Sequence, residues 1–154
     1  MKAGEIAPDF ELPDETGKVR ALRDFLETGP VVLFFYPAAM TKGCTAESCH
    51  FRDLAAEFSA VGAHRIGISP DAVDKQAEFS DLHGFDYPLL SDADGAVATQ
   101  FGVRRSFGPL LTRRQTFVID TDQKVLEVIK SELRMAVHAD RALAVLRARV
   151  HPTD

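Results

Sequence analysis

The segment PVVLFFYPAAMTKGCTAESCHF, residues 30–51, joins an apolar run to both cysteines of the chain. Residues 30–37 form a continuous apolar stretch between two prolines, which is typical of a central strand covered on both faces. From Thr41 onward the apolar residues recur at helical spacing, and Gly62 ends this pattern. One helix is therefore expected over residues 42–60, directly after the buried strand.

Similar periodicities continue on both sides of this segment. Residues 8–12 are expected to form an extended N-terminal arm, and residues 104–114 a loop that carries four arginines. The other expected elements are strands at 63–70, 86–92, 115–120 and 125–130, and helices at 71–84, 92–103 and about 136–149. This order predicts an α/β, thioredoxin-like fold with a mixed central sheet and helices on both faces. No repeat or linker divides residues 1–154, so we expect a single domain.

Composition and charge argue against several classes of partner. Of the 154 residues, 45% are hydrophobic and 27% are charged, as in an ordinary globular protein. The net charge is −5 and the basic residues are scattered, which argues against binding to nucleic acid. No apolar run approaches the ~20 residues that cross a membrane. The N-terminus lacks an apolar core followed by a cleavage site, so a cytoplasmic location is expected.

Cys44 is expected in the first turn of the helix that follows the buried strand. Unpaired N–H groups and the positive end of the helix dipole stabilise a thiolate at such a position, so Cys44 is a candidate nucleophile. The alternatives are a buried cysteine that acts as a small hydrophobic residue, and a zinc site, for which only His50 is nearby. A cysteine pair in a reducing cytosol is more often catalytic, redox-sensing or metal-binding than structural.

The spacing of Cys44 and Cys49 constrains what the two thiols can do. Within one helix, five positions give a rise of ~7.5 Å, a rotation of ~140° and a Cα separation of ~8.6 Å. A disulfide needs Cα atoms less than about 7 Å apart. The two thiols can therefore bond only when the first turns of the helix unwind, so any oxidised form must differ in backbone from the reduced one.

Pro37, Thr41 and Cys44 stand in the pattern PxxxTxxC, which resembles the signature of the peroxiredoxins. The continuation Thr45-Ala46-Glu47, with Cys49 five residues after the first cysteine, is similar to the bacterioferritin comigratory protein branch, also called the Q type. The resemblance extends over nearly the whole chain and includes the stretches APDFELPDETG and RQTFVID.

This resemblance implies a thiol-specific peroxidase of the atypical two-cysteine kind, which reduces hydrogen peroxide and organic hydroperoxides. Cys44 would be the peroxidatic cysteine and would become a sulfenic acid. Cys49 would be the resolving cysteine, and thioredoxin or a similar dithiol reductant would recycle the intramolecular disulfide. The implied chemistry needs no bound cofactor or metal, and the implied assembly is a monomer or a weak homodimer.

The resemblance also assigns roles to Thr41 and Pro37, which lie near Cys44 in the sequence. Thr41 would hydrogen-bond the thiolate and the peroxide oxygen, or would instead cap the helix by accepting from the Cys44 N–H. Pro37 would shield the thiolate from water, although a proline that ends a strand is common in any fold.

Arg114 matches the family arginine on the strand beside the active site, where a cation stabilises the thiolate and the transition state of O–O cleavage. Its neighbour Arg113 is the competing candidate, and the alternative is a solvated arginine pair. Glu47 would orient the arginine network, or would be a first-turn acid that suits the helix dipole. Lys42 departs from the family pattern, in which proline or another uncharged residue is usual.

A protein of another class, a peroxide sensor that signals through the same disulfide, would carry the same two thiols. The histidines show no spacing that suits a triad or a metal site and are interpreted as structural or surface residues; they are His50, His64, His83, His138 and His151.

Overall fold

A computed structural model describes residues 1–107 and 111–150. Within these residues the chain forms a five-stranded sheet in the order β5-β4-β3-β6-β7 and a two-stranded hairpin, β1-β2. The elements are β1 (Glu11–Pro13), β2 (Val19–Ala21), α1 (Leu22–Leu26), β3 (Val31–Phe35), α2 (Lys42–Asp53), α3 (Ala55–Ala60), β4 (His64–Ser69), α4 (Val73–His83), β5 (Leu89–Ser91), α5 (Ala96–Gln100), β6 (Gln115–Ile119), β7 (Val125–Lys130) and α6 (Met135–Val150). The expected loop at 104–114 lies partly outside the described residues.

The central strand of the large sheet is β3, and all five of its residues are buried. It runs parallel to β4 and antiparallel to β6, and the hairpin of β6 and β7 completes one edge. The continuous apolar run predicted this position, because a strand with neighbours on both sides and helices on both faces exposes no side chain to water. The expected mixed sheet is confirmed.

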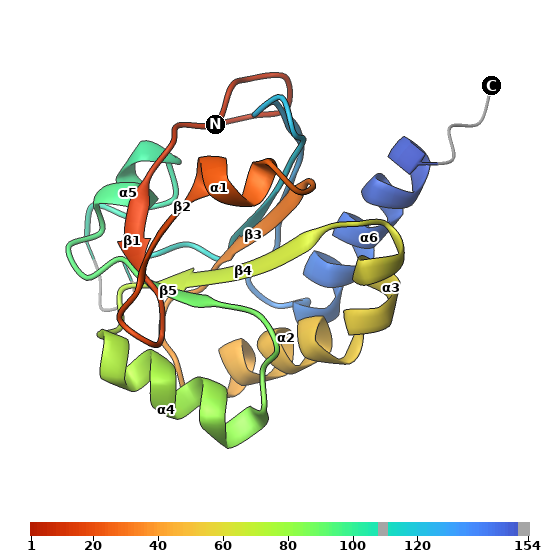
Figure 1. Ribbon diagram of the computed structural model, residues 1–154. Coiled ribbons are helices and arrows are strands. Elements are labelled where there is room, and N and C mark those ends of the chain that lie inside the picture. The colour runs from red at the N-terminus through yellow and green to blue at the C-terminus, as the bar shows by residue number, and fades with distance from the viewer. Residues whose placement is uncertain (108–110, 151–154) are drawn as a thin grey trace.

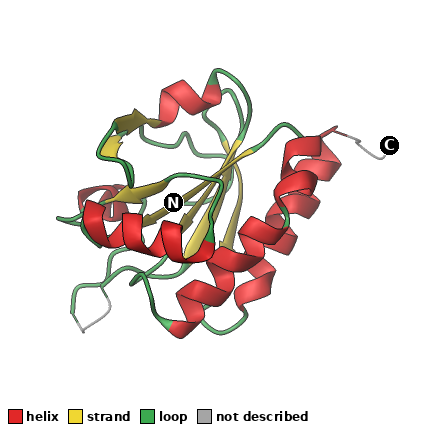
Figure 2. Ribbon diagram, turned by 60° about the horizontal axis from the view of Figure 1, so that its bottom comes forward, coloured by secondary structure: helices red, strands yellow, loops and turns green. Residues whose placement is uncertain are grey.

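Helices cover both faces of this sheet, as Figures 1 and 2 show. Alternate residues of β3 point to opposite sides, so that Leu33 packs with α1 and α5 while Phe34 packs with α2, α3, α4 and α6. Phe34 stacks on Phe51 of α2 at a ring separation of 4.2 Å, which fixes α2 against the sheet.

The helix expected over residues 42–60 is wrong in one respect, because Leu54 divides it into α2 and α3. The backbone of Leu54 has φ −95° and ψ 21°, outside the α-helical range. The guanidinium of Arg65 donates a hydrogen bond of 2.8 Å to the Phe51 carbonyl, which a continuous helix would offer to the N–H of Ala55. Asp86 holds Arg65 through two hydrogen bonds of 3.0 and 2.7 Å, so a side chain inserted into the helical ladder causes the break.

The short helix α5 begins later than the expected helix at 92–103. The two carboxylate oxygens of Asp92 accept hydrogen bonds from the N–H groups of Val97 and Ala98, at 3.1 and 2.9 Å. Asp92 therefore caps the helix from outside it, as aspartates commonly do at helix starts. Among the described residues, no helix has the length and apolar character needed to cross a bilayer.

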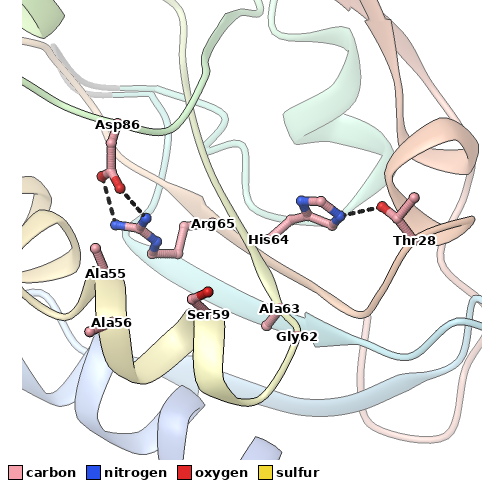
Figure 3. Close-up of a pocket in the computed structure, with 9 residues that line it drawn as sticks. All are labelled: Thr28, Ala55, Ala56, Ser59, Gly62, Ala63, His64, Arg65 and Asp86. Atoms are coloured by element: carbon pink, nitrogen blue, oxygen red, sulfur yellow. Dashed lines mark hydrogen bonds and ion pairs between the residues drawn. The ribbon is translucent and has the colours of Figure 1, made fainter.

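A pocket of about 590 Å³ opens beside α3 and the start of β4. Figure 3 shows the Arg65–Asp86 pair at one side of it and a hydrogen bond of 2.6 Å between Thr28 and His64 at the other. His64 pairs with Val31 at the first position of β3. The pocket therefore lies at the opposite end of β3 from Cys44, which follows the end of that strand.

Candidate active site

The loop between β3 and α2 brings Cys44 to the carboxyl end of the central strand. Its backbone is held by Asp71, whose carboxylate accepts a hydrogen bond of 2.6 Å from the Ala39 N–H. Met40 has φ 69°, a left-handed conformation that a residue other than glycine rarely adopts. Cys44 then becomes the third residue of α2, with its side chain fully buried. The chain thus delivers a buried thiol to the first turn of a helix, as expected.

Arg114 reaches this thiol from the neighbouring strand. It directly precedes β6, whose first residue Gln115 pairs with Phe35 at the end of β3. One guanidinium nitrogen, Nη2, lies 3.1 Å from the Cys44 sulfur. Burial acts to lower the pKa of Arg114, but the nearby Glu47 and Cys44 raise it, so that the guanidinium stays charged. Its competitor Arg113 is exposed.

Gly43 leaves room for this contact. A Cβ atom at Gly43 would lie 3.3 Å from Arg114 Nη2, which is tighter than ordinary van der Waals contact. A side chain at this position would therefore press on the guanidinium, which would have to shift by a few tenths of an ångström. Glycine here favours the close approach of the Arg114 side chain, and its own backbone conformation does not call for glycine.

Glu47 holds the other side of the guanidinium. Its carboxylate oxygen Oε1 lies 3.3 Å from Arg114 Nη1, and its side chain is fully buried. Burial raises the pKa of Glu47 to about 8, although the charge of Arg114 opposes the change. The alternative of a first-turn acid that suits the helix dipole is wrong, because Glu47 lies in the second turn of α2 and faces the protein interior.

Thr41 and Pro37 lie at the edge of the site. The Thr41 hydroxyl donates a hydrogen bond of 2.7 Å to the Ala38 carbonyl. Thr41 occupies the N-cap position of α2 but makes no side-chain capping bond there, so the expected bond from the Cys44 N–H is wrong. Pro37 is partly buried just beyond β3. Their roles toward a thiolate and a peroxide stay predictions.

Cys49 shares helix α2 with Cys44. Both are free thiols within the described part of the chain, and Cys49 is only partly buried. Burial raises the pKa of Cys49, with Arg52 opposing the change. Between the two cysteines, the carbonyl of Ser48 accepts a buried hydrogen bond of 2.6 Å from the Tyr87 hydroxyl. The helix that separates the thiols is therefore fastened to the neighbouring β5 side of the molecule.

One buried residue near the site, His138, was not predicted from the sequence to belong to it. His138 lies on the inner face of α6, which packs against α2, and its Nε2 atom is 3.5 Å from Glu47 Oε2. The helical spacing of Ala139, Ala142 and Leu146 could have predicted that His138 is buried, because it lies on the same face of α6. Its polar partners lie 7 and 22 residues away, so no local motif includes them.

Comparisons with known proteins agree with this geometry. The model of the AhpC/TSA family matches residues 3–128 of the chain. Peroxiredoxin Bcp of Escherichia coli is 39% identical over 152 residues, which are 96% of each chain. The crystal structure of peroxidoxin BcpB from Mycobacterium tuberculosis is 63% identical with a TM-score of 0.93, and covers 96% of this chain and 97% of that one.

A solved structure of the bacterioferritin comigratory protein of Xanthomonas campestris is 33% identical, with a TM-score of 0.82 and 91% of each chain covered. That structure addresses the alkyl peroxide reduction activity of the Xanthomonas protein. The thioredoxin-like fold and the thiol peroxidase class expected from the sequence are therefore confirmed. The buried Cys44 thiol is in contact with the Arg114 cation, and the relatives above match nearly the full length of the chain. The chain therefore belongs to the AhpC/TSA family, in the bacterioferritin comigratory protein branch of the peroxiredoxins.

Proposed function

We propose that Cys44 is the peroxidatic cysteine of this peroxidase. Its thiolate sulfur attacks the terminal oxygen of a hydroperoxide, the O–O bond breaks, and the oxygen stays on Cys44 as a sulfenic acid. The leaving oxygen departs as an alkoxide or hydroxide and takes a proton from water. The contact of 3.1 Å between Arg114 Nη2 and the Cys44 sulfur carries this proposal, since it places a fixed positive charge where both the thiolate and the transition state are negative.

Cys49 is the resolving cysteine in this proposal. Its sulfur attacks the sulfenic sulfur of Cys44, the S–S bond forms and the oxygen leaves as water. Since both cysteines lie in the wound helix α2, the first turns must open before the sulfurs can meet. The catalytic cycle therefore needs two backbone states of α2: the wound helix attacks peroxide, and the opened helix forms the disulfide.

The disulfide is reduced by thioredoxin or a similar dithiol protein, through exchange at an exposed sulfur. Cys49 is the more exposed of the two thiols and is the natural point of attack. Hydrogen peroxide and organic hydroperoxides are the proposed substrates, and the activity named for the Xanthomonas relative supports the second class. We place the enzyme in the cytoplasm, because a dithiol reductant needs a reducing compartment. We also propose that it is a single domain that works as a monomer or a weak homodimer.

A coupled assay tests these roles. Wild type, Cys44→Ser and Cys49→Ser are each supplied with peroxide and a thioredoxin system, and continuous consumption of peroxide is followed. We expect wild type to turn over, Cys44→Ser to be inactive, and Cys49→Ser to oxidise once and stop. Peroxide consumption by Cys44→Ser would overturn the peroxidatic role, full turnover by Cys49→Ser would overturn the resolving role, and a single turnover by wild type would indicate a sensor.

A further inference from the structure

The connection between β7 and α6 is fastened to the beginning of β6. The backbone carbonyl of Ser131 accepts a hydrogen bond of 2.8 Å from His138 Nε2, and Nδ1 of the same ring lies 2.8 Å from the Thr116 hydroxyl on β6. A carbonyl oxygen only accepts, so Nε2 carries the hydrogen and Nδ1 of the neutral ring accepts from Thr116. The Ser131 hydroxyl accepts a further bond of 2.9 Å from the Arg134 N–H, just before α6. The residue after Ser131, Glu132, therefore starts from a fixed place beside β6.

Glu132 uses this position to bind the backbone of Arg114. Its Oε1 atom accepts a hydrogen bond of 3.2 Å from the Arg114 N–H, and a second one of 2.8 Å from Arg105 Nη2. The guanidinium of the same Arg114 lies 3.1 Å from the Cys44 sulfur through its Nη2 atom. One carboxylate therefore holds the main chain of the residue whose side chain contacts the thiol.

Arg114 needs such an anchor because it lies just outside the sheet. The first residue of β6 that pairs with β3 and with β7 is Gln115, so the ladders of the sheet begin one residue after Arg114. Residues that follow a loop move more than those within a strand. A displacement of the main chain at Arg114 would carry its guanidinium away from the thiol.

We propose that Glu132 is a positioning residue of the peroxidase, which anchors the main chain of Arg114 so that its guanidinium meets the Cys44 thiol. This inference rests on the proposed role of Cys44. Glu132 acts through Arg114 and takes no part itself in the attack on peroxide. Arg105 holds the Glu132 carboxylate from the opposite side.

The charge of Glu132 opposes the chemistry, so its contribution must come from its position. Burial raises the pKa of Glu47 to about 8, and the charge of Glu132 adds to this rise while Arg114 opposes it. A negative charge beside Arg114 also disfavours a second one on the Cys44 sulfur. Removal of the charge alone should therefore not slow the thiol, whereas removal of the hydrogen-bond acceptor should.

Two substitutions separate the charge of Glu132 from its role as an acceptor. Glu132→Gln removes the charge but keeps an amide oxygen that can accept from the Arg114 N–H, whereas Glu132→Ala removes both. Glu127→Ala is the matched control, because Glu127 is also paired with an arginine, Arg141, at 2.8 Å, and it lies on β7. Glu132 is 47% exposed, so we expect all three variants to fold.

Each variant is made in the Cys49→Ser background, so that only the oxidation of Cys44 is followed. The remaining thiol is trapped with an alkylating reagent after rapid mixing with hydrogen peroxide and counted by mass spectrometry. We expect Glu132→Ala to slow oxidation about fivefold, because catalysis is sensitive to small displacements of a reacting site. Glu132→Gln should keep most of the reference rate, and Glu127→Ala should leave it unchanged. Hydrogen exchange of the Arg114 amide, measured by NMR, should become faster in Glu132→Ala but not in Glu132→Gln.

Equal slowing by Glu132→Gln and Glu132→Ala would overturn the proposal, because the charge would then matter and not the acceptor. An unchanged or faster rate in Glu132→Ala, an equal loss of rate in Glu127→Ala, or unchanged exchange of the Arg114 amide would also overturn it. The reference rate of the Cys49→Ser protein separates this result from the proposed function. A reference protein that does not oxidise at Cys44 would refute that function whatever Glu132 does.

Discussion

Tyr87→Phe is expected to speed formation of the Cys44–Cys49 disulfide while leaving the attack on peroxide unchanged. The Tyr87 hydroxyl donates its hydrogen bond of 2.6 Å to the carbonyl of Ser48, which lies between the two cysteines. This bond exists only while α2 is wound at that point. It therefore stabilises the reactive, closed helix against the open form that the disulfide requires.

The size of the effect follows from the burial of this bond. A hydrogen bond between neutral groups contributes about 1 kcal/mol to the state that contains it. Its removal therefore raises the equilibrium constant for opening of the helix about fivefold. If opening is fast and precedes the condensation of the sulfenic acid with Cys49, the disulfide forms about fivefold faster. Less sulfenic acid then survives to be oxidised to the sulfinic acid at high peroxide.

Tyr36→Phe is a matched control, because the Tyr36 hydroxyl donates an equally buried hydrogen bond of 2.6 Å to Gln76 on α4 instead of to α2. Both variants are mixed with peroxide, quenched with an alkylating reagent at successive times and analysed by mass spectrometry for disulfide and sulfinic acid. Equal acceleration in the two variants, or an unchanged rate of disulfide formation in Tyr87→Phe, would refute the reasoning.

Two further substitutions test how the thiol is surrounded. Gly43→Ala introduces a Cβ atom 3.3 Å from Arg114 Nη2, so we expect the guanidinium to move away from the Cys44 sulfur. Oxidation of Cys44 should then slow about fivefold to tenfold in the same quenched assay. An unchanged rate would show that the arginine tolerates the displacement. Asp71→Ala leaves the Ala39 N–H without its acceptor and should cost about 1–3 kcal/mol in the free energy of unfolding, measured with urea, as well as slowing oxidation. Asp74→Ala, an exposed aspartate on the following helix, is the control, and an equal loss of stability there would contradict a specific role for Asp71.

The sequence could predict those parts of the fold that depend on local patterns. The strand at β3 is surrounded by prolines and contains only apolar residues, so its central place follows from its own composition. The break at Leu54 could not be predicted in this way, because the group that causes it is the guanidinium of Arg65, which is remote in sequence from the carbonyl it binds. Helical periodicity continues through Leu54 without interruption.

The active site likewise contains residues that sequence motifs predict and residues that only tertiary packing brings there. Cys44 and Arg114 belong to motifs, and the pairing of β6 with β3 brings them together. The burial of Glu47 depends instead on how α2 packs against α6, which no short pattern records. His138 was interpreted as a structural or surface residue because its partners come from separate elements, and each of them is an ordinary residue in its own segment.

The separation of α2 from α3 also bears on how such an enzyme can diversify. A helix of 12 residues is close to the length at which an isolated helix is only marginally stable, and the break at Leu54 prevents α2 from gaining stability by continuing into α3. Its tendency to melt is then governed by a few tertiary contacts, such as those of Tyr87 and Arg65, which bind backbone carbonyls of α2. Substitutions at those contacts can tune how much peroxide the protein withstands before irreversible inactivation, while the reacting groups stay the same. Reactivity and tolerance to oxidant can therefore evolve independently in this fold.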